Sequence, residues 1–204
     1  LRNRLDAALA GPEDVTRYRE ALEATIEESD GLIRTFDALL MIARVEAGSS
    51  PAAAVPVDLA EIAREVGELW EPVAEDGGGR LVVVAEAPVP VSGVRELLAQ
   101  AISNLVDNAL KYGRPAEGEA VITVSVERRG DRAVLRVADN GPGVPEADRH
   151  RVLDRFTRLE ASRSAPGSGL GLALVAAVAR HHRGEIELAD AGPGLAVTLR
   201  LPLA

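Results

Sequence analysis

The sequence predicts an α+β protein in which a helical hairpin is followed by a two-layer α/β sandwich with a mixed sheet. An apolar stripe with steps of three and four runs through one long segment, from Pro12 to about Ala47. A stretch rich in Gly, Ser, Pro and Ala follows at 48–54 and is typical of a linker. Over 55–204, short apolar runs alternate with helical patterns at hairpin-length spacing. This rhythm favours a mixed or antiparallel sheet with helices on one face.

Two helices are predicted before the linker. Residues 1–11 form a short helix that ends at Gly11, and Pro12 opens the next one, because Pro is tolerated in a first helical turn. The apolar stripe of the long helix consists of Val15, Tyr18, Leu22, Ile26, Leu32, Ile33, Phe36, Leu39, Leu40, Ala43 and Ala47. A helix about 50 Å long cannot bury such a stripe against the short one. It needs a longer partner, either a segment outside these residues, another chain, or both, and a coiled-coil stalk would show the same pattern.

The region after the linker alternates between strands and helices. Helices are expected from Leu59 to about Ala74, from about Val94 to Tyr112 and from about Gly169 to His182. Extended segments are expected at Val55–Val57, Leu81–Ala85, Val89–Val91, Val121–Glu127, Ala133–Ala138, Glu185–Leu188 and Leu195–Leu201. A polar segment from Val144 to Pro166 precedes the last helix, and loops of this length are usually functional or mobile.

Composition excludes several classes of protein. Hydrophobic residues make up 47% of the chain and aromatic residues only 2%, so the core must consist of Ala, Val, Leu and Ile. A net charge of −9 argues against a non-specific nucleic-acid binder, which needs clustered Lys and Arg. With no cysteine, disulfides and thiolate metal sites are excluded. The longest apolar runs are far below the roughly 20 residues that span a bilayer, so we expect no membrane contact by these residues.

The first motif with chemical content is Asn104-Leu-Val-Asp-Asn-Ala-Leu-Lys-Tyr-Gly113. On a helix, Asn104, Asn108, Lys111 and Tyr112 share one face, and apolar residues mark the other side. Asparagine is a poor helix former, so the sequence accepts a local cost on this face. Amide oxygens and an ammonium group suit Mg²⁺ and phosphate. An ordinary solvated helix face would show the same pattern.

The second motif, Asp139-Asn-Gly-Pro-Gly143, directly follows a predicted strand. Gly141 and Gly143 would let the backbone approach a ligand, while the carboxylate of Asp139 accepts a hydrogen bond from an amine. A plain turn is the alternative interpretation.

The third motif, Arg155-Phe-Thr-Arg158, lies in the polar segment. Five arginines occur close together in an otherwise acidic chain: Arg149, Arg151, Arg155, Arg158 and Arg163. Charge runs are most often solvated, but Phe156 within this one suggests an anchor that docks the segment.

The fourth motif, Gly167-Ser-Gly-Leu-Gly-Leu172, opens the last predicted helix. Glycines at a helix N-terminus leave backbone N–H groups free to bind phosphate. The spacing misses the dinucleotide fingerprint Gly-x-Gly-x-x-Gly, and the chain has no phosphate loop of the Gly-x-x-x-x-Gly-Lys-Ser/Thr type. Both common nucleotide-binding folds are therefore disfavoured.

In order and spacing, the four motifs resemble the N box, first glycine box, F box and second glycine box of histidine kinases. This family belongs to an ATPase superfamily that includes DNA gyrase, MutL and a large heat-shock chaperone. The resemblance implies a catalytic ATP-binding domain over residues 55–204, with the polar segment as its ATP lid. Residues 1–47 resemble part of the dimerisation and histidine-phosphotransfer hairpin, and Leu39-Leu-Met-Ile-Ala-Arg-Val-Glu-Ala-Gly48 is similar to the end of its second helix.

The resemblance also implies residue roles around Mg²⁺-ATP. Asn108 ligates Mg²⁺, and Asn104 contacts phosphate or metal-bound water. Lys111 meets phosphate and Tyr112 the nucleoside. Asp139 accepts a hydrogen bond from the adenine amino group, which selects ATP over GTP.

The remaining implied roles fall on the glycine boxes and the lid. Gly141 and Gly143 shape the adenine pocket, and Arg158, with Arg155, reaches the terminal phosphates. The phosphates are wrapped by a run of five residues: Gly167, Ser168, Gly169, Leu170 and Gly171.

Two features concern the reaction itself. Hydrolytic members of the superfamily carry a Glu where this chain has Asn104, and an amide cannot act as a general base, so ATP is expected to be held for transfer. The family's acceptor histidine is not evident, because the only histidines are His150, His181 and His182. His150 lies in the lid, and the other two lie at a helix C-terminus, where a cation is favourable anyway. We therefore expect no catalytic residue within these residues and an acceptor upstream of Leu1.

The resemblance finally implies a protein-histidine kinase that forms a homodimer through the helical hairpin and passes phosphate to an Asp of a response-regulator receiver domain. It would be the cytoplasmic portion of a membrane-anchored bacterial sensor, without a nucleic-acid partner. An ATP-binding signalling scaffold that lacks an acceptor histidine, or an ATPase of the superfamily, are the alternatives.

Overall fold

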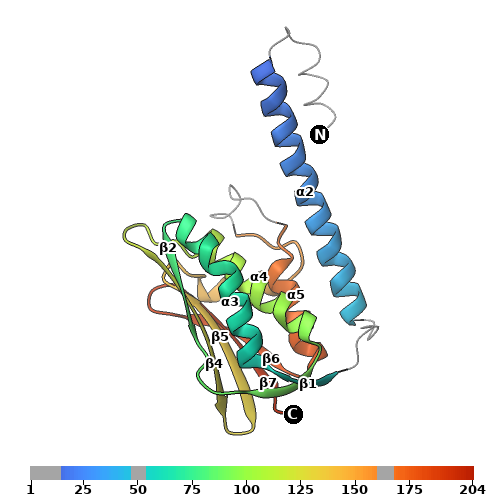
Figure 1. Ribbon diagram of the computed structural model, residues 1–204, viewed down its shortest axis with the longest axis vertical. Helices are drawn as coiled ribbons and strands as arrows, with labels where there is room; N and C mark the ends of the chain where they lie inside the picture. The colour runs from blue at the N-terminus through green and yellow to red at the C-terminus, as the bar shows by residue number, and fades with distance from the viewer. Residues whose placement is uncertain (1–14, 47–53, 160–167) are drawn as a thin grey trace. The chain divides into compact units, whose positions relative to one another are not determined.

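The computed structural model describes residues 15–46, 54–159 and 168–204. The chain divides into two compact units, one ending at Leu40 and one running from Met41 to Ala204. The predicted α+β class is confirmed, since a long helix precedes a mixed five-stranded sheet with helices (Figure 1). The expected helix at 1–11 and almost all of the expected linker lie outside the described residues.

The long N-terminal helix, α2, spans Val15–Glu46 and has 32 residues. Three of its hydroxyl groups bond to the preceding turn: Thr25 donates to the Ala21 carbonyl at 2.7 Å, Ser29 to the Thr25 carbonyl at 2.8 Å and Thr35 to the Gly31 carbonyl at 2.8 Å. Seven large apolar side chains are exposed along the helix: Val15, Leu22, Ile26, Leu32, Ile33, Phe36 and Leu40. The predicted apolar stripe therefore faces solvent over this length of α2.

The main sheet has the strand order β2-β4-β5-β7-β6. Its strands are β2 (Gly79–Val84), β4 (Ala120–Arg129), β5 (Arg132–Asp139), β6 (Glu185–Asp190) and β7 (Leu195–Pro202). Strand β2 runs parallel to β4, and all other neighbours are antiparallel, so the predicted mixed sheet is confirmed. A separate antiparallel pair, β1 (Val55–Asp58) and β3 (Pro90–Gly93), adjoins the chain's C-terminus, where Val91 bridges Leu203.

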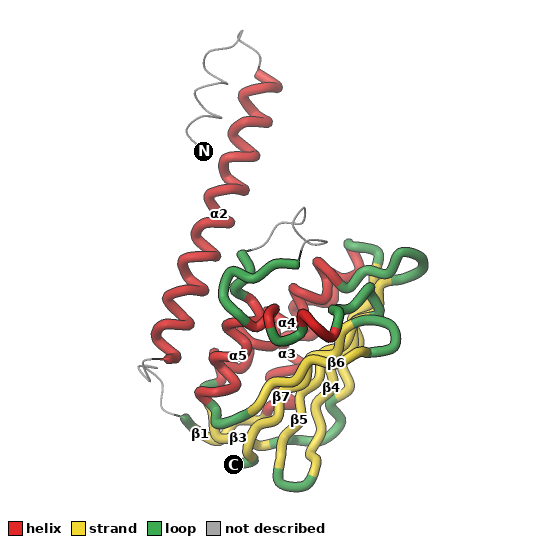
Figure 2. Tube along the Cα trace, turned by 180° about the vertical axis from the view of Figure 1, so that it is seen from behind, coloured by secondary structure: helices red, strands yellow, loops and turns green. Residues whose placement is uncertain are grey.

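Three helices cover one face of the main sheet: α3 (Leu59–Asp76), α4 (Arg95–Tyr112) and α5 (Gly171–His181). The front and back views both show them together on that face (Figures 1 and 2). Alternate strand residues point toward them. Val124, Val137 and Val197, for example, lie side by side on β4, β5 and β7 and are all buried. The second layer of the sandwich therefore packs on a continuous apolar strand surface.

Most helices and strands differ from the predicted ranges by one or two residues. The clearest shift is in α5, which begins at Gly171 rather than at Gly169, because Gly169 has a φ of +70° that a right-handed helix cannot contain. The polar segment is partly ordered by two short 3₁₀ turns, η1 (Glu146–Asp148) and η2 (Arg151–Leu153).

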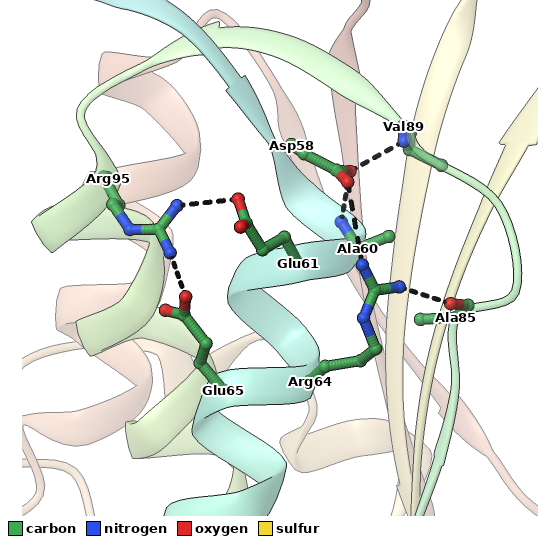
Figure 3. A network of polar contacts seen from close by, with 8 residues as sticks. All are labelled: Asp58, Ala60, Glu61, Arg64, Glu65, Ala85, Val89 and Arg95. Carbon is green, nitrogen blue, oxygen red and sulfur yellow. Dashed lines mark hydrogen bonds and ion pairs between the residues drawn. The ribbon is translucent and has the colours of Figure 1, made fainter.

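The start of α3 is fixed by the carboxylate of Asp58 (Figure 3). One oxygen accepts hydrogen bonds from the N–H groups of Ala60 at 3.0 Å and Val89 at 2.8 Å. The Arg64 guanidinium donates to the Ala85 carbonyl at 2.6 Å and lies 3.8 Å from Asp58. An N-cap of this kind stabilises a helix by about 1 kcal/mol. Here it also joins α3 to the connection between β2 and β3.

The start of α4 is joined to α3 by Arg95, which forms ion pairs with Glu61 at 3.3 Å and with Glu65 (Figure 3). All three side chains are partly exposed, and such pairs contribute little stability individually. Their effect is geometric, because one guanidinium on α4 binds two carboxylates on consecutive turns of α3.

A second attachment of α4 is the side chain of His182, at the C-terminus of α5. Among the described residues it is the only polar residue that is buried as a whole. Its Nε2 accepts a hydrogen bond from the Val94 N–H at 3.0 Å, and its Nδ1 donates to the Val178 carbonyl at 2.8 Å. Burial lowers the pKa of His182, the bond to Val178 opposes this effect, and neighbouring His181 adds to the lowering. The expectation of a favourable cation is therefore wrong for His182, which must be neutral to accept from Val94.

We predict that His182→Ala lowers the free energy of unfolding by about 2–4 kcal/mol at pH 8, because the Val94 N–H loses its acceptor and a cavity opens. The folded-state pKa of His182 lies below its ordinary value of about 6.5. The stabilisation by the neutral ring is therefore complete above that pH and is lost as the pH falls below it. Urea unfolding should show a smaller difference between variant and parent at pH 5.5 than at pH 8.

His150→Ala is the matched control, since His150 is exposed. Its unfolding free energy should stay within about 0.5 kcal/mol of the parent. A His182→Ala effect of equal size at both pH values would contradict the assignment of a neutral, hydrogen-bonded ring.

Candidate functional site

Two asparagines on α4 have buried amide nitrogens for which the described residues provide no hydrogen-bond acceptor. Asn104 and Asn108 are half-buried, one turn apart on the same face. In the described part of the chain, the Nδ2 atoms of both are buried and have no hydrogen-bond partner. Leaving a buried polar group unpaired costs roughly 1–3 kcal/mol. Two such groups on one face indicate a place that a polar ligand completes.

The other two predicted residues of α4 lie near its C-terminus. Lys111 is exposed, and its Nζ lies 2.5 Å from a carboxylate oxygen of Asp107 on the same helix. Tyr112 is half-buried and is the last residue of α4. The structure therefore gives Lys111 a partner within α4, which a phosphate would have to replace.

The N-terminus of α5 lies next to Asn108. A Cβ atom on Gly171 would be 3.2 Å from the Asn108 Nδ2, so the backbone of α5 approaches this amide directly. Among the described residues no side chain caps the helix, which leaves the first N–H groups of α5 without a capping acceptor. The side chain of Leu170 is fully buried, so any ligand contact of Leu170 would involve its backbone. Ser168 is half-buried, and Gly167 lies outside the described residues.

The segment that ends at Leu159 is attached through its backbone to the residues just before α5. Phe156 has a positive φ of 62°, and its N–H donates to the Gly169 carbonyl at 2.9 Å. Its side chain is 60% exposed, so the prediction of an aromatic anchor is wrong as regards the side chain. Arg155 is exposed and Arg158 half-buried on either side of this contact.

Asp139 ends strand β5, and its carboxylate is oriented by the backbone. One oxygen, Oδ1, accepts hydrogen bonds from the N–H groups of Gly141 at 2.9 Å and Leu195 at 3.2 Å. Alternate residues of a strand point to the same face, and Asp139 alternates with Val137 and Leu135 on β5. Its side chain therefore lies on the face that the helices cover. Burial there raises the pKa of Asp139, and the two backbone hydrogen bonds lower it only in part.

Glycines bring the backbone close to Asp139. A Cβ atom on Gly141 would lie 2.6 Å from the Cα of Gly113, and one on Gly143 would lie 2.9 Å from the Gly194 carbonyl oxygen. Gly113 and Gly194 in turn adjoin Asp139 itself. Sequence reasoning gave no role to Gly194 or Leu195, since Ala191-Gly-Pro-Gly194 has only the pattern of a turn.

Helix α4 connects these two regions. Gly113, directly after α4, contacts Asp139, while Asn108 lies five residues earlier beside Gly171. At about 1.5 Å per residue, the two contacts are some 7–8 Å apart along the helix. A carboxylate acceptor thus lies at one end, and unsatisfied amide and backbone N–H donors lie at the other. This arrangement suits a ligand with an amine at one end and anionic groups at the other.

Comparison with known proteins gives a consistent result. A family described as "Histidine kinase-, DNA gyrase B-, and HSP90-like ATPase" matches residues 93–204. The sensor protein IrlS of Burkholderia pseudomallei is 35% identical over 179 residues, which cover 87% of this chain and 38% of IrlS. The chain spans about two fifths of the length of the curated relatives it matches.

Solved structures of histidine kinases also resemble the chain. The mycobacterial sensor histidine kinase MprB is 34% identical, with a TM-score of 0.60 over 73% of this chain and 97% of that structure. Full-length ShkA in complex with AMPPNP is 25% identical, with a TM-score of 0.75 over 97% of this chain and 41% of that structure.

We predict that Asp139→Asn leaves the free chain at least as stable as the parent at pH 7. Asn keeps an oxygen that can accept from Gly141 and Leu195, and it removes the half-buried charge. Because the pKa of Asp139 is raised in the folded state, the parent loses stability as the pH rises through that pKa. Urea unfolding should therefore show any advantage of the variant at pH 7 shrinking toward pH 4.

Asp131→Asn, in the exposed turn between β4 and β5, is the control for a general effect of removing one negative charge. A loss of more than about 1 kcal/mol in Asp139→Asn at pH 7 would show that the carboxylate is retained for stability.

Proposed function

The chain belongs to the sensor histidine kinases and carries their ATP-binding catalytic domain, and from this premise we propose that it delivers the γ-phosphate of ATP to a histidine outside these 204 residues. The observation that carries the proposal is the pair of buried amide nitrogens of Asn104 and Asn108 that have no partner among the described residues. Asn108 lies beside the start of α5, which no side chain of the described ranges caps. The AMPPNP complex of ShkA supports it, since AMPPNP is an analogue of ATP.

In this proposal the adenine lies at Asp139 and the phosphates lie at α5. The Asp139 carboxylate accepts a hydrogen bond from the adenine amino group, and Gly141 and Gly143 keep the adenine pocket open. The backbone N–H groups at the start of α5 bind phosphate oxygens, because a helix N-terminus favours anions. Tyr112 contacts the nucleoside between these two ends.

The remaining phosphate contacts come from three cationic side chains and from the segment before α5. Lys111 turns from Asp107 to a phosphate, and Arg155 and Arg158 reach the terminal phosphates from the lid. The backbone of Gly167, Ser168, Gly169, Leu170 and Gly171 surrounds them. Phosphoryl transfer depends mainly on positioning and charge neutralisation, so this set is chemically sufficient.

Mg²⁺ fits the donor set on α4. The Asn108 amide nitrogen is buried, has no partner in the described part of the chain and lies against Gly171, and amide oxygens are among the ligands that Mg²⁺ accepts. Asn108 would hold the ion together with the phosphates, whose charge the ion would neutralise. Asn104 would contact a phosphate or a water molecule bound to the ion.

The absence of a base at position 104 favours transfer over hydrolysis. By the resemblance to the wider superfamily, hydrolytic members place a Glu at this position to activate water. The Asn104 amide cannot accept a proton from water near neutral pH. We therefore propose that bound ATP reacts with an acceptor side chain rather than with water.

None of the three histidines of this chain is proposed as that acceptor. Both ring nitrogens of His182 are engaged and buried. His150 lies beside the 3₁₀ turn η2, and His181 is the last residue of α5. The acceptor is proposed to lie on a helix that packs against α2.

The exposed stripe of α2 is proposed to form a homodimer with the same region of a second chain. Phosphate then passes from the histidine to an Asp of a response-regulator receiver domain. None of the helices in the described residues combines the length and hydropathy that crossing a bilayer demands. We propose that the chain is the cytoplasmic portion of a longer, membrane-anchored bacterial sensor.

We predict that Asn108→Ala lowers the affinity for AMPPNP on the order of 10- to 100-fold when Mg²⁺ is present, because hydrogen bonds to charged groups contribute about 1.5–3 kcal/mol. Isothermal titration calorimetry with and without Mg²⁺ measures this effect. Gln100→Ala, at an exposed position of the same helix, should bind like the parent. Equal affinities of Asn108→Ala and the parent with Mg²⁺ would overturn the site.

We also predict that the 204-residue chain binds Mg²⁺-ATP without forming phosphohistidine. Incubation with γ-³²P-ATP, followed by alkaline electrophoresis, should leave the protein unlabelled. Acid-labile label on the parent that disappears in a His150→Ala or His181→Ala variant would place the acceptor within this chain and contradict the proposal.

A further inference from the structure

The turn between β6 and β7 contacts the carboxylate at the end of β5. The antiparallel register pairs Ala138 with Ala196, and one further step places Leu195 opposite Asp139. The Leu195 N–H does not continue the ladder there but donates to the Asp139 side chain at 3.2 Å. The first residue of β7 therefore orients a side chain of β5.

Gly194 makes this contact possible. It is buried and has a φ of +106°, which L-residues with a side chain rarely adopt. A Cβ atom at this position would overlap the Asp139 carbonyl group and lie 2.9 Å from the Asp139 Oδ1. Any side chain here would push the turn and Asp139 apart.

Gly113 adjoins Asp139 from α4. A Cβ atom on Gly113 would lie 2.5 Å from the Asp139 Cβ and 2.6 Å from its Cγ. The φ of Gly113 is −90°, so a larger residue there would suffer from collisions with Asp139 and with the Ala109 carbonyl oxygen, and not from backbone strain. The backbone at Gly113 and the backbone at Gly194 therefore both limit the positions that the Asp139 side chain can adopt.

These contacts determine which carboxylate oxygen is available. Oδ1 is occupied by the N–H groups of Gly141 and Leu195. In the described part of the chain no hydrogen bond is made to Oδ2. The side chain thus presents one oxygen in a fixed orientation as an acceptor.

We propose that Gly113, Gly194 and the Leu195 N–H are positioning residues that fix the Asp139 carboxylate and thereby make the site selective for adenine over guanine nucleotides. The inference rests on the proposed function. Adenine presents an amine donor at its C6 position, whereas guanine presents a carbonyl oxygen. A fixed carboxylate binds the first and repels the second, while a displaced one loses much of this distinction.

The test compares Gly194→Ala with Gly192→Ala in the same turn. Gly192 also has a positive φ, of 64°, but a Cβ atom there meets nothing within 4 Å. Both variants carry backbone strain, and only Gly194→Ala collides with Asp139. We expect the ratio of AMPPNP affinity to GMPPNP affinity to fall about tenfold or more in Gly194→Ala and to remain at the parent's value in Gly192→Ala. Partial unfolding would lower both affinities alike and leave the ratio unchanged.

Gly113→Ala is the second variant, for use if Gly194→Ala does not fold, and it should lower the ratio in the same direction. A readout without nucleotide is the Leu195 amide resonance of ¹⁵N-labelled protein during a pH titration. In the parent and in Gly192→Ala it should shift with the protonation of Asp139, and in Gly194→Ala this shift should be lost.

The outcomes separate the two proposals. If the parent binds AMPPNP and GMPPNP equally, the assignment of adenine to Asp139 fails, whatever the variants do. If the parent is selective and both Gly194→Ala and Gly113→Ala fold with unchanged selectivity, the positioning role is overturned and the proposed function stands. A parent Leu195 amide that does not titrate with Asp139 would also overturn the positioning role.

Discussion

A carboxylate on the helix-covered face of the sheet is the constraint on which this end of the catalytic domain depends. The same row of β5 carries Leu135 and Val137, which are buried and apolar, and ends at Asp139. An ionised group there loses hydration, so it requires donors at short range. The donors are backbone N–H groups, and backbone comes this close only where neighbouring residues lack a Cβ atom, as Gly113 and Gly194 do. Four segments of the chain therefore meet at one side chain.

Helix α4 links Asp139 to the region around Asn108, where the phosphates are proposed to bind. Its last turn is set against Asp139 through Gly113, and one and a half turns earlier it presents Asn108 to the start of α5. The start of α4, far from both of these contacts along the helix, is attached separately. The Val94 N–H bonds to His182, and Arg95 forms ion pairs with α3. The buried amides of Asn104 and Asn108 leave hydrogen-bonding capacity unused in the free chain. Attachments at both ends hold α4 in place despite this cost, which a polar ligand would offset.

Sequence reasoning was accurate where a feature depends on neighbours along the chain. Alternation located β4 and β5, and the Asp-Asn-Gly-Pro-Gly pattern placed Asp139 at the end of a strand. It failed where distant residues combine. The donor Leu195 is 56 residues from Asp139, and the acceptor His182 is 88 residues from Val94. Neither pairing follows from composition or periodicity, since both depend on strand register and helix packing. Phe156 was misread because an aromatic residue in a polar segment suggests burial, whereas the backbone makes the contact with Gly169.

On the proposed function, the same physical features explain why such a domain holds ATP without consuming it. The proposed phosphate contacts are amides, backbone N–H groups, an ammonium group and guanidinium groups, none of which removes a proton from water near neutral pH. They can neutralise and orient the terminal phosphate but cannot create a nucleophile. The nucleophile must come from elsewhere, and its approach has to be specific. The exposed apolar stripe of α2, on the other unit of the chain, provides a surface on which an acceptor helix could be recruited by burial of Leu22, Ile26 and Phe36. On the proposed function, the catalytic domain therefore holds and orients the phosphate, and the helix recruited by α2 provides the nucleophile.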